Sequence, residues 1–389
     1  MDPRVVVSGL GVVSPLGTEL EDFWQALLYA DSAPEEYPHA HPERLPNRLA
    51  YRVPDGPDAR PAGSRTVAFA LRAAEAALRD AGLAPAPEGT LIGACVATAT
   101  GNQDVLEARR LGLAAPPPLE AYPFSVAPAL ATRLDLGGPV VTLSTACAAG
   151  CYSLSLAAQA LADERADVML VVGADSISRV TQACFNRMNA LDPLVCRPFD
   201  AERAGTVYGE GAAALVLETE AHARRRGRAH AYAVVAGSGW SCDGHHATAP
   251  DPAGVQIERA LQRALDDAGL GLGDIDCIVA HGTGTELNDL AESHVMEQAF
   301  GADLERLSVC APKSKLGHTA GAAGAFACLT AALILDRGLV PPTANLTRID
   351  PRCRLPLHTD WPRPLAARHV LVNAYAFGGN NISVILGAA

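Results

Sequence analysis

The feature that most constrains the fold of this 389-residue sequence is an internal repeat of the same elements in the same order. The apolar stretch Val5–Val13 has a counterpart in Tyr232–Gly239, and the amphipathic stretch Thr66–Leu83 has one in Gly254–Gly269. Each amphipathic stretch closes with the tripeptide Asp-Ala-Gly, a signal for the C-terminus of a helix. The repeat predicts two similar strand-and-helix units.

Later segments extend the repeat. Leu91–Gly101 is matched by Ile275–Gly284, and Thr206–Leu217 is matched by Ala374–Leu386. These segments read as continuously apolar strands that alternate with helices, a pattern typical of α/β proteins with buried sheets. The sequence therefore predicts a duplicated α/β fold.

The boundary between the two units is expected near the basic run Arg224–Arg228. We assign residues 1–228 to the first unit and residues 229–389 to the second. The basic run is interpreted most simply as a solvated linker, and the alternative is a docking patch for an acidic partner.

Composition narrows the class of protein. Hydrophobic residues make up 49% of the chain and charged residues 19%, which suits a large buried core. The net charge of −12 argues against a nucleic-acid or anionic-membrane partner. No apolar run is expected to reach the roughly 18–20 residues of a membrane helix, and no secretion signal is evident. We therefore expect no membrane insertion and a cytoplasmic location, where ten cysteines without C-x-x-C spacing stay reduced.

The stretch Val140–Gly150 holds the best candidate nucleophile. A β-branched run ends in small residues, Cys147 lies at the break, and a helix pattern follows from Ser153 to Ala162. A thiol at a helix N-terminus is expected to favour its thiolate form, because free N–H groups and the helix dipole stabilise negative charge. The alternative is a buried, unreactive cysteine.

Three motifs of the second unit fall at corresponding strand ends, where α/β folds build their sites. They are His281-Gly282-Thr283-Gly284-Thr285, Lys313-Ser314-Lys315-Leu316-Gly317-His318 and Phe377-Gly378-Gly379-Asn380-Asn381. Taken singly, each histidine is more simply a structural residue. Together they predict that the second unit surrounds Cys147 with two imidazoles and a lysine.

The adjacent pair His245 and His246 is not expected to bind a metal, because no carboxylate-rich or cysteine partner set accompanies it. We instead expect His246 to line the mouth of a tunnel. No metal site is predicted in this chain.

These motifs give the sequence a resemblance to a known family. It is similar to β-ketoacyl-acyl-carrier-protein synthases, the elongating ketosynthases of the thiolase superfamily in type II fatty acid and polyketide systems. The resemblance covers nearly the whole chain. It rests on the three motifs above together with Thr145-Ala146-Cys147-Ala148-Ala149-Gly150, Arg197-Pro198-Phe199-Asp200 and Gly209-Glu210-Gly211.

The resemblance implies a thiolase-like fold of five α-β-α-β-α layers, assembled as a homodimer or as a heterodimer with a ketosynthase-like subunit. It also implies an acyltransferase that performs a decarboxylative Claisen condensation of malonyl-acyl-carrier-protein with a cysteine-bound acyl chain. The acyl carrier protein would be the partner, and its phosphopantetheine would leave the enzyme with no cofactor of its own.

The resemblance further implies roles for single residues. Cys147 accepts the acyl group, and its N–H and that of Phe377 form the oxyanion hole. His281 and His318 bind the malonyl thioester carbonyl and stabilise the enolate, while Lys313 organises the site electrostatically.

Supporting roles follow in the same way. Glu292 is the acid that holds Lys313. Thr283 and Thr285 bind the phosphopantetheine arm, Phe377 gates the nucleophile, and Phe185 forms a wall of the acyl pocket, although a plain core phenylalanine is an equal alternative.

Residue types separate the relatives. Thiolases carry a second catalytic cysteine where this chain has Phe377-Gly378-Gly379, and initiating synthases use Cys-His-Asn. The remaining alternative is a catalytically silent chain-length partner subunit, which lacks the cysteine found here at position 147.

Three departures from the family pattern also stand out. Ala327 replaces a family glutamate, the last turn begins Ala374-Tyr375-Ala376, and Thr206 replaces a large residue. They point to a specialised polyketide or polyene pathway.

Overall fold

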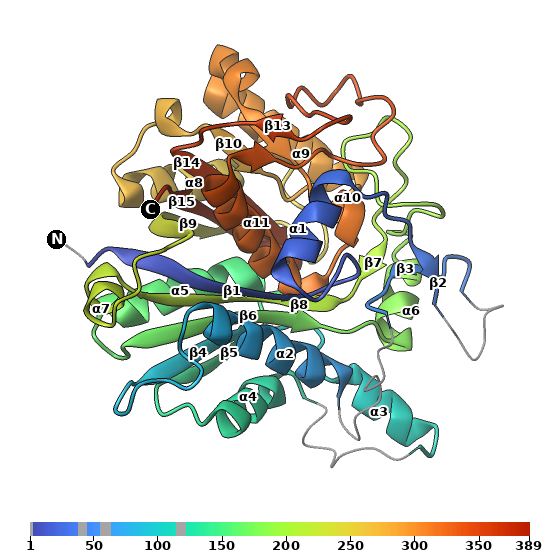
Figure 1. Cartoon of the computed structure of the whole chain (residues 1–389). Helices are drawn as coiled ribbons and strands as arrows, with labels where there is room; N and C mark the ends of the chain where they lie inside the picture. Colours follow the sequence, from blue (N-terminus) through green and yellow to red (C-terminus); the bar gives the residue numbers. More distant parts are fainter. Residues whose placement is uncertain (1–2, 38–44, 55–63, 114–121) are drawn as a thin grey trace.

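The computed structural model describes residues 3–37, 45–54, 64–113 and 122–389 (Figure 1). Ten of the described strands form one continuous sheet in the order β11-β10-β14-β15-β9-β1-β8-β6-β4-β5. The order falls into two halves of five strands, one from each part of the repeat.

The first half of the sheet comes from the N-terminal part of the chain. Its strands are β5 (Val140–Leu143), β4 (Ile92–Ala97), β6 (Val168–Asp175), β8 (Gly211–Thr219) and β1 (Val5–Val13). β4 runs parallel to β5 and β6, whereas β8 runs antiparallel to β6 and β1. Strands β4, β6 and β1 are buried along their whole length, as continuously apolar sequences require.

The second half repeats this arrangement strand for strand. It contains β11 (Ser308–Cys310), β10 (Cys277–Val279), β14 (His369–Ala376), β15 (Asn380–Gly387) and β9 (Ala233–Cys242). β10 is parallel to β11 and β14, and β15 is antiparallel to β14 and β9. Residues Val5–Val7 of β1 pair with Ala233–Val235 of β9 and join the halves. The predicted duplication is present in the topology, and the boundary after residue 228 stays a prediction.

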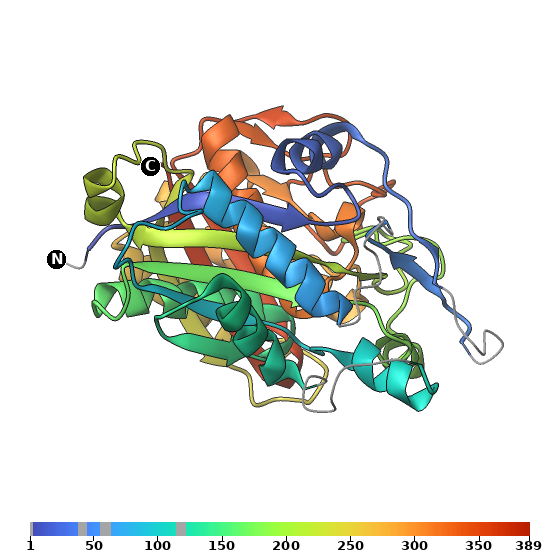
Figure 2. The same cartoon turned by 60° about the horizontal axis from the view of Figure 1, so that its bottom comes forward.

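Helices divide the protein into five layers (Figures 1 and 2). α2 (Arg65–Asp80) and α4 (Val126–Leu134) cover the outer face of the first half. α8 (Val255–Ala268) and α9 (Glu286–Phe300) cover the outer face of the second. α5 (Ala149–Ala162) and α11 (Ala323–Arg337) lie between the halves, in the largest apolar cluster. This confirms the predicted five-layered α/β fold.

The two central helices cross where each has a glycine. A Cβ atom at Gly150 would lie 2.2 Å from the backbone nitrogen of Ala325, and one at Gly324 would lie 2.5 Å from that of Cys151. No side chain fits between the helices at this point, so glycine is required on both.

Shorter elements complete the described chain. The helices are α1 (Leu20–Tyr29), α3 (Gln103–Arg110), α6 (Arg179–Arg187), α7 (Glu220–Arg225) and α10 (Lys313–Leu316). The strands are β2 (Glu35–Glu36), β3 (Leu49–Tyr51), β7 (Tyr208–Gly209), β12 (Leu339–Val340) and β13 (Arg363–Pro364). α6 contributes to the site described below.

The expectation that no apolar run has the length of a membrane helix is wrong for one segment. By length and composition alone, residues 320–337 could cross a membrane. This segment contains α11, and 83% of it is buried inside the protein. A core helix enclosed by two sheet halves explains its apolar composition.

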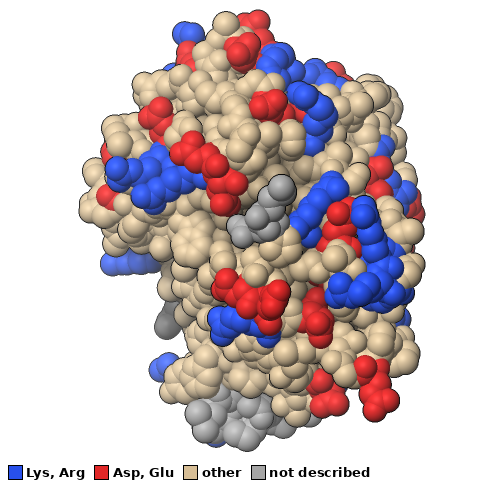
Figure 3. All heavy atoms as spheres, turned by 90° about the vertical axis from the view of Figure 1, so that its left-hand side faces the viewer, with Lys and Arg blue, Asp and Glu red and all other residues tan. Residues whose placement is uncertain are grey.

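The basic run Arg224–Arg228 lies in and after α7, at the opposite end of the molecule from α6 (Figure 1). Arg224 pairs with Glu220 at 2.9 Å, and Arg226 pairs with the buried Glu218. Figure 3 shows this end of the molecule with basic and acidic side chains interleaved. These ion pairs favour the linker interpretation over the docking patch.

Candidate active site

Cys147 lies where the chain leaves β5 and enters the 3-10 turn Ala146–Ala148 ahead of α5. Ala146 adopts a left-handed φ of 48°, which turns the chain sharply at this point. The thiol is buried, and burial raises its pKa to about 11, with the ammonium of Lys313 opposing the shift. This direction is opposite to the one expected for a thiol at a helix terminus, because loss of solvation outweighs the helix terminus.

The loop that carries His281 is shaped by two carboxylates of α9. The N–H groups of His281 and Gly282 each donate to Glu292 at 2.8 Å. The N–H groups of Thr283 and Gly284 donate to Asp289 at 3.1 and 3.2 Å. Four successive backbone donors thus point at one face of a helix, where residues three apart lie together.

Lys313, at the start of α10, fixes the protonation pattern of His281. Its ammonium donates to the carbonyl oxygen of His281 and lies 3.4 Å from the ring Nδ1. An ammonium can only donate, so Nδ1 accepts and the neutral ring carries its proton on Nε2.

His318 is held in the same tautomer by a different donor. The backbone N–H of Ala320 donates to His318 Nδ1 at 3.0 Å, which leaves the proton on Nε2. The backbone of His318 is itself fixed, because its N–H donates to the carbonyl of Val207 at 2.7 Å.

Both imidazoles are neutral near pH 7. Burial and the charge of Lys313 lower the pKa of His318 to about 3. The same two causes, together with His318, hold the pKa of His281 well below its usual value. The ring centroids lie 6.1 Å apart with perpendicular planes. The site therefore offers two N–H donors that carry no charge.

Glu292 has a different place from the one expected. Its carboxylate accepts from the N–H groups of His281 and Gly282, and the hydrogen bonds of the Lys313 ammonium in the described residues go to His281. It acts on Lys313 through charge at longer range, and burial raises its own pKa to about 7. Lys313 is held by His281 instead.

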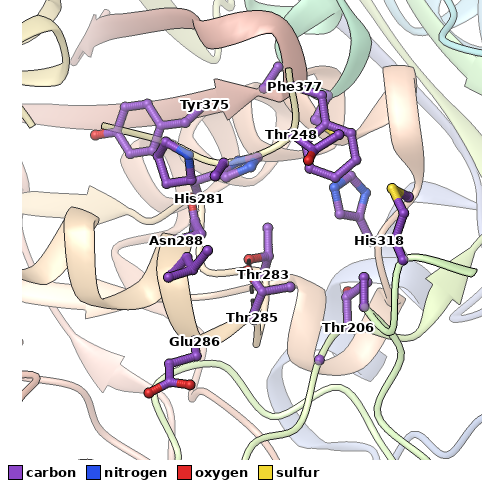
Figure 4. A pocket seen from close by; sticks show the side chains of 18 of the residues that line it. Thr206, Thr248, His281, Thr283, Thr285, Glu286, Asn288, His318, Tyr375 and Phe377 are labelled. Atoms are coloured by element: carbon purple, nitrogen blue, oxygen red, sulfur yellow. Dashed lines mark hydrogen bonds between the residues drawn. The ribbon is translucent and has the colours of Figure 1, made fainter. Parts of the chain in front are cut away.

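Cys147, His281 and His318 line one cavity of about 500 Å³. Figure 4 shows His281, Thr283, Thr285, His318 and Phe377 around it, and Cys147 lines the same space. The hydroxyl groups of Thr283 and Thr285 lie 2.8 Å apart. The cavity thus joins a thiol from the first half of the chain to two imidazoles and two hydroxyl groups from the second.

Two aromatic rings form the apolar wall of the cavity. Phe185 on α6 stacks on Phe377 with a centroid distance of 6.2 Å and lies 6.4 Å from the ring of His318. Phe377 begins the turn after β14 and is 37% exposed. Phe185 thus lines the cavity, and it also packs edge-on against the buried Tyr208 at 5.1 Å, so both expected descriptions apply to it.

Several lining residues carried a weaker signal or none in the sequence. Thr248 and His246 line the cavity from the loop after β9, and Thr206 lines it as well. Of these three residues, Thr248 was not singled out from the sequence, although it lies two residues from His246. Tyr375 packs edge-on against His281 at 5.6 Å, at a position that was noted only as a departure.

Asp289 was missed, although a signal for it exists. It lies three residues before Glu292 on α9, and both carboxyl groups follow a glycine-rich loop. Acidic residues on one helix face beside a run of exposed N–H groups are a recognisable pattern.

Among the described residues, no group of three or more His, Cys, Asp or Glu side chains could hold a metal ion.

Comparison with known proteins now identifies the family. Residues 2–223 match the β-ketoacyl synthase N-terminal domain, and residues 232–347 match its C-terminal domain. The chain belongs to the β-ketoacyl synthase family. This confirms the resemblance of the motifs and assigns the chain to the acyltransferases.

Individual ketosynthases resemble it over almost their full length. A putative polyketide β-ketoacyl synthase 1 of Streptomyces halstedii is 36% identical, with 99% of this chain and 98% of the relative covered. A 3-oxoacyl-[acyl-carrier-protein] synthase 2 of Coxiella burnetii is 32% identical, with 98% of each covered. The solved ishigamide ketosynthase/chain length factor is 34% identical, covers both chains completely and gives a TM-score of 0.92.

Proposed function

We propose that this ketosynthase elongates an acyl chain carried on Cys147 with two carbons from a malonyl thioester. The acyl group first passes from its carrier thioester to Sγ, and the carrier thiol leaves with the thiol proton. The malonyl group then loses carbon dioxide, and the resulting enolate attacks the acyl carbon and expels Sγ. The products are a β-ketoacyl thioester, carbon dioxide and the Cys147 thiolate, which takes up a proton from water to restore the thiol.

One observation carries this proposal. A cysteine from the first half and two neutral, Nε2-protonated histidines from the second line one cavity. A decarboxylating malonyl thioester develops negative charge on its carbonyl oxygen, and two uncharged donors stabilise that charge without giving the oxygen a proton. Lys313 serves this chemistry by lowering the pKa values of both rings and by orienting that of His281.

The acyl-transfer step needs a separate pair of donors. We assign these to the N–H groups of Cys147 and Phe377, which belong to the two turns at the sulfur. The carbonyl oxygen of the acyl thioester becomes negative as Sγ attacks, so backbone donors aimed at it lower the barrier.

The thiol must lose its proton as it attacks, because burial raises its pKa to about 11. When the tetrahedral intermediate collapses, the bond to the carrier sulfur breaks, and the carrier thiolate that leaves takes up this proton.

The remaining cavity residues suit a carrier arm. Thr283 and Thr285 present hydroxyl groups for the amides of phosphopantetheine, while Phe377 shields Cys147 and Phe185 lines the acyl chain. The arm arrives on an acyl carrier protein, so we propose that the enzyme holds neither a cofactor nor a metal of its own.

We further propose a cytoplasmic dimer in a type II polyketide pathway. The partner is a second copy or a chain-length-factor subunit, as the name of the ishigamide complex suggests for that protein. The chain itself is the active member of such a pair, because Cys147 is in place at the cavity.

Labelling with a cerulenin-like electrophile tests this function. Mass spectrometry is expected to find the adduct on Cys147 in the folded protein, and a Cys151→Ala variant is the matched control, since Cys151 lies in α5, directly after the turn that carries Cys147. Absence of label at Cys147 would favour the silent partner subunit.

A further inference from the structure

The two halves contain two nearly identical turns at the start of the central helices. Thr145–Gly150 reads Thr-Ala-Cys-Ala-Ala-Gly, and Thr319–Gly324 reads Thr-Ala-Gly-Ala-Ala-Gly. Ala146 and Ala320 adopt left-handed φ angles of 48° and 49°, and each turn is a 3-10 turn that leads into a helix. We call these the first and second elbows. Gly321 occupies in the second elbow the place that Cys147 has in the first.

The second elbow already binds an anion. The N–H of Gly321 donates to Oδ2 of Asp175 at 2.7 Å. Asp175 is the last residue of β6, opposite the first residue of β8. The corresponding strand end in the second half is Ala376, opposite the first residue of β15, and it carries no carboxylate. Cys147 of the first elbow therefore lines the cavity, whereas the N–H of Gly321 in the second elbow is bonded to the side chain of Asp175.

Asp175 is fully buried and anchored on both oxygens. Oδ1 accepts from the hydroxyl of Thr98 at 2.8 Å and from the N–H and hydroxyl of Thr100 at 3.0 and 2.9 Å. Oδ2 accepts from the N–H of Ala99 at 2.8 Å in addition to that of Gly321. The carboxylate thus ties the turn after β4 to the second elbow.

The second elbow is also the element that orients His318. Ala320, with its strained left-handed φ, donates its N–H to Nδ1 of His318. The next N–H along the chain is the one that Asp175 holds. A non-glycine residue keeps such a conformation only where its surroundings fix it, and the bond to Asp175 is the adjacent restraint.

We propose that Asp175 is a positioning residue for His318, which it serves by clamping the second elbow. The proposal rests on the proposed function, because it assumes that His318 binds the malonyl carbonyl. Asp175 touches no substrate. It keeps the N–H of Ala320 in line with the ring, so that His318 presents its Nε2 proton to the cavity.

Asp175→Asn tests the proposal in the intact enzyme. The amide keeps the shape of the side chain but has one acceptor oxygen for five donors, so the N–H groups of Ala99 and Gly321 meet an NH₂ group or lose their partner. We expect decarboxylation of malonyl carrier protein to fall about 10-fold or more, as a misplaced catalytic group does.

Alkylation of Cys147 by iodoacetamide provides the contrasting readout. It is expected to stay unchanged or to quicken, because the variant removes a negative charge that disfavours the thiolate. A merely structural role predicts that both rates fall together, and that result would overturn the proposal. Unchanged decarboxylation would overturn it as well.

Thr100→Val is the matched control. It removes one hydroxyl donor from Oδ1 and leaves the bond between Oδ2 and Gly321, so decarboxylation is expected to change less than about 2-fold. If Asp175→Asn does not fold, Asp175→Glu gives the same test, since it keeps the charge but shifts it by one methylene. It is expected to lose decarboxylation more than alkylation, and equal losses would contradict the clamp.

A direct measurement completes the design. Nitrogen NMR of histidine-labelled enzyme, assigned with His318→Ala, is expected to find His318 as the Nε2–H tautomer in the wild type and as a mixture in Asp175→Asn. An unchanged tautomer in the variant would overturn the proposal. Full decarboxylation by His318→Ala would instead refute the proposed function, so the two failures are distinguishable.

Discussion

The turns after β4 and β10 occupy equivalent places in the two halves and have opposite uses. In the first half, Thr98, Ala99 and Thr100 donate hydrogen bonds to the buried carboxylate of Asp175. In the second, the backbone of His281–Gly284 is held from behind by Asp289 and Glu292, which leaves the side chains facing the cavity. One half supplies the sulfur and structural anchoring, and the other supplies the proton donors. Duplication has allowed each copy to keep one part of the chemistry.

The largest expected effect is the loss of condensation when the sulfur is removed from the first half. Cys147→Ala is expected to lower condensation at least about 1000-fold, because no nucleophile remains to carry the acyl group. Product formation from purified acyl and malonyl carrier proteins measures it. Cys147→Ala combined with Gly321→Cys keeps a cysteine in an elbow and is expected to stay inactive, because Asp175 and close packing fill that site. Recovery of activity would show that the two elbows are interchangeable.

The next largest effect is expected on decarboxylation, when one imidazole donor is removed from the second half. His281→Ala or His318→Ala is expected to lower malonyl decarboxylation about 100-fold, the usual cost of one preorganised donor at a developing oxyanion. Release of carbon dioxide from malonyl carrier protein is the measurement. Alkylation of Cys147 serves as the control and should persist in both variants. Decarboxylation at the wild-type rate would remove the histidines from the mechanism.

A smaller effect concerns the charge that links the halves. Lys313→Met removes the cation that opposes the high pKa of Cys147 and that lowers the pKa values of both histidines. The thiol should then ionise at higher pH, so iodoacetamide alkylation near neutral pH should slow by about 3- to 10-fold. Lys315→Met, two residues away and directed at α1, is the matched control. Faster alkylation in Lys313→Met would contradict this sign.

The last effect is on stability rather than on a rate, and it concerns Glu292. Its folded-state pKa is raised from 4.5 to about 7, so the unfolded chain releases this proton first as the pH rises. This group therefore lowers the free energy of unfolding by about 3 kcal/mol between pH 4.5 and 7. Urea unfolding of the wild type and Glu292→Gln should show the difference shifting in favour of the variant across that window. A pH-independent difference would mean that the carboxylate ionises normally in the folded protein.

The repeat and the motif positions could be read from the sequence because they depend on local pattern. Apolar runs and Asp-Ala-Gly endings marked the strands and helices, and strand ends placed Cys147, His281 and His318 at one edge. The family resemblance supplied the layers and the expected roles. Thr283, Thr285, Phe185 and Phe377 also lie at the cavity, where that resemblance put them.

The parts that could not be read depend on partners distant in sequence. The ionisation of Cys147 follows from burial by both halves, and helix-terminus reasoning alone gave the wrong sign. Glu292 bonds the backbone ahead of its own helix, while Asp175 meets Gly321 across 146 residues. The sequence shows where the carboxylates are, but their hydrogen-bond donors depend on how the chain packs.

The glycine contact between α5 and α11 sets the scale of the whole site. Because backbone touches backbone there, the crossing leaves no room for a Cβ atom on either helix. Each elbow leads directly into one of these helices, so the crossing sets how closely the two elbows approach. A single added methyl group at the crossing would push the two helices apart, and with them the sulfur at one elbow and the N–H that orients His318 at the other.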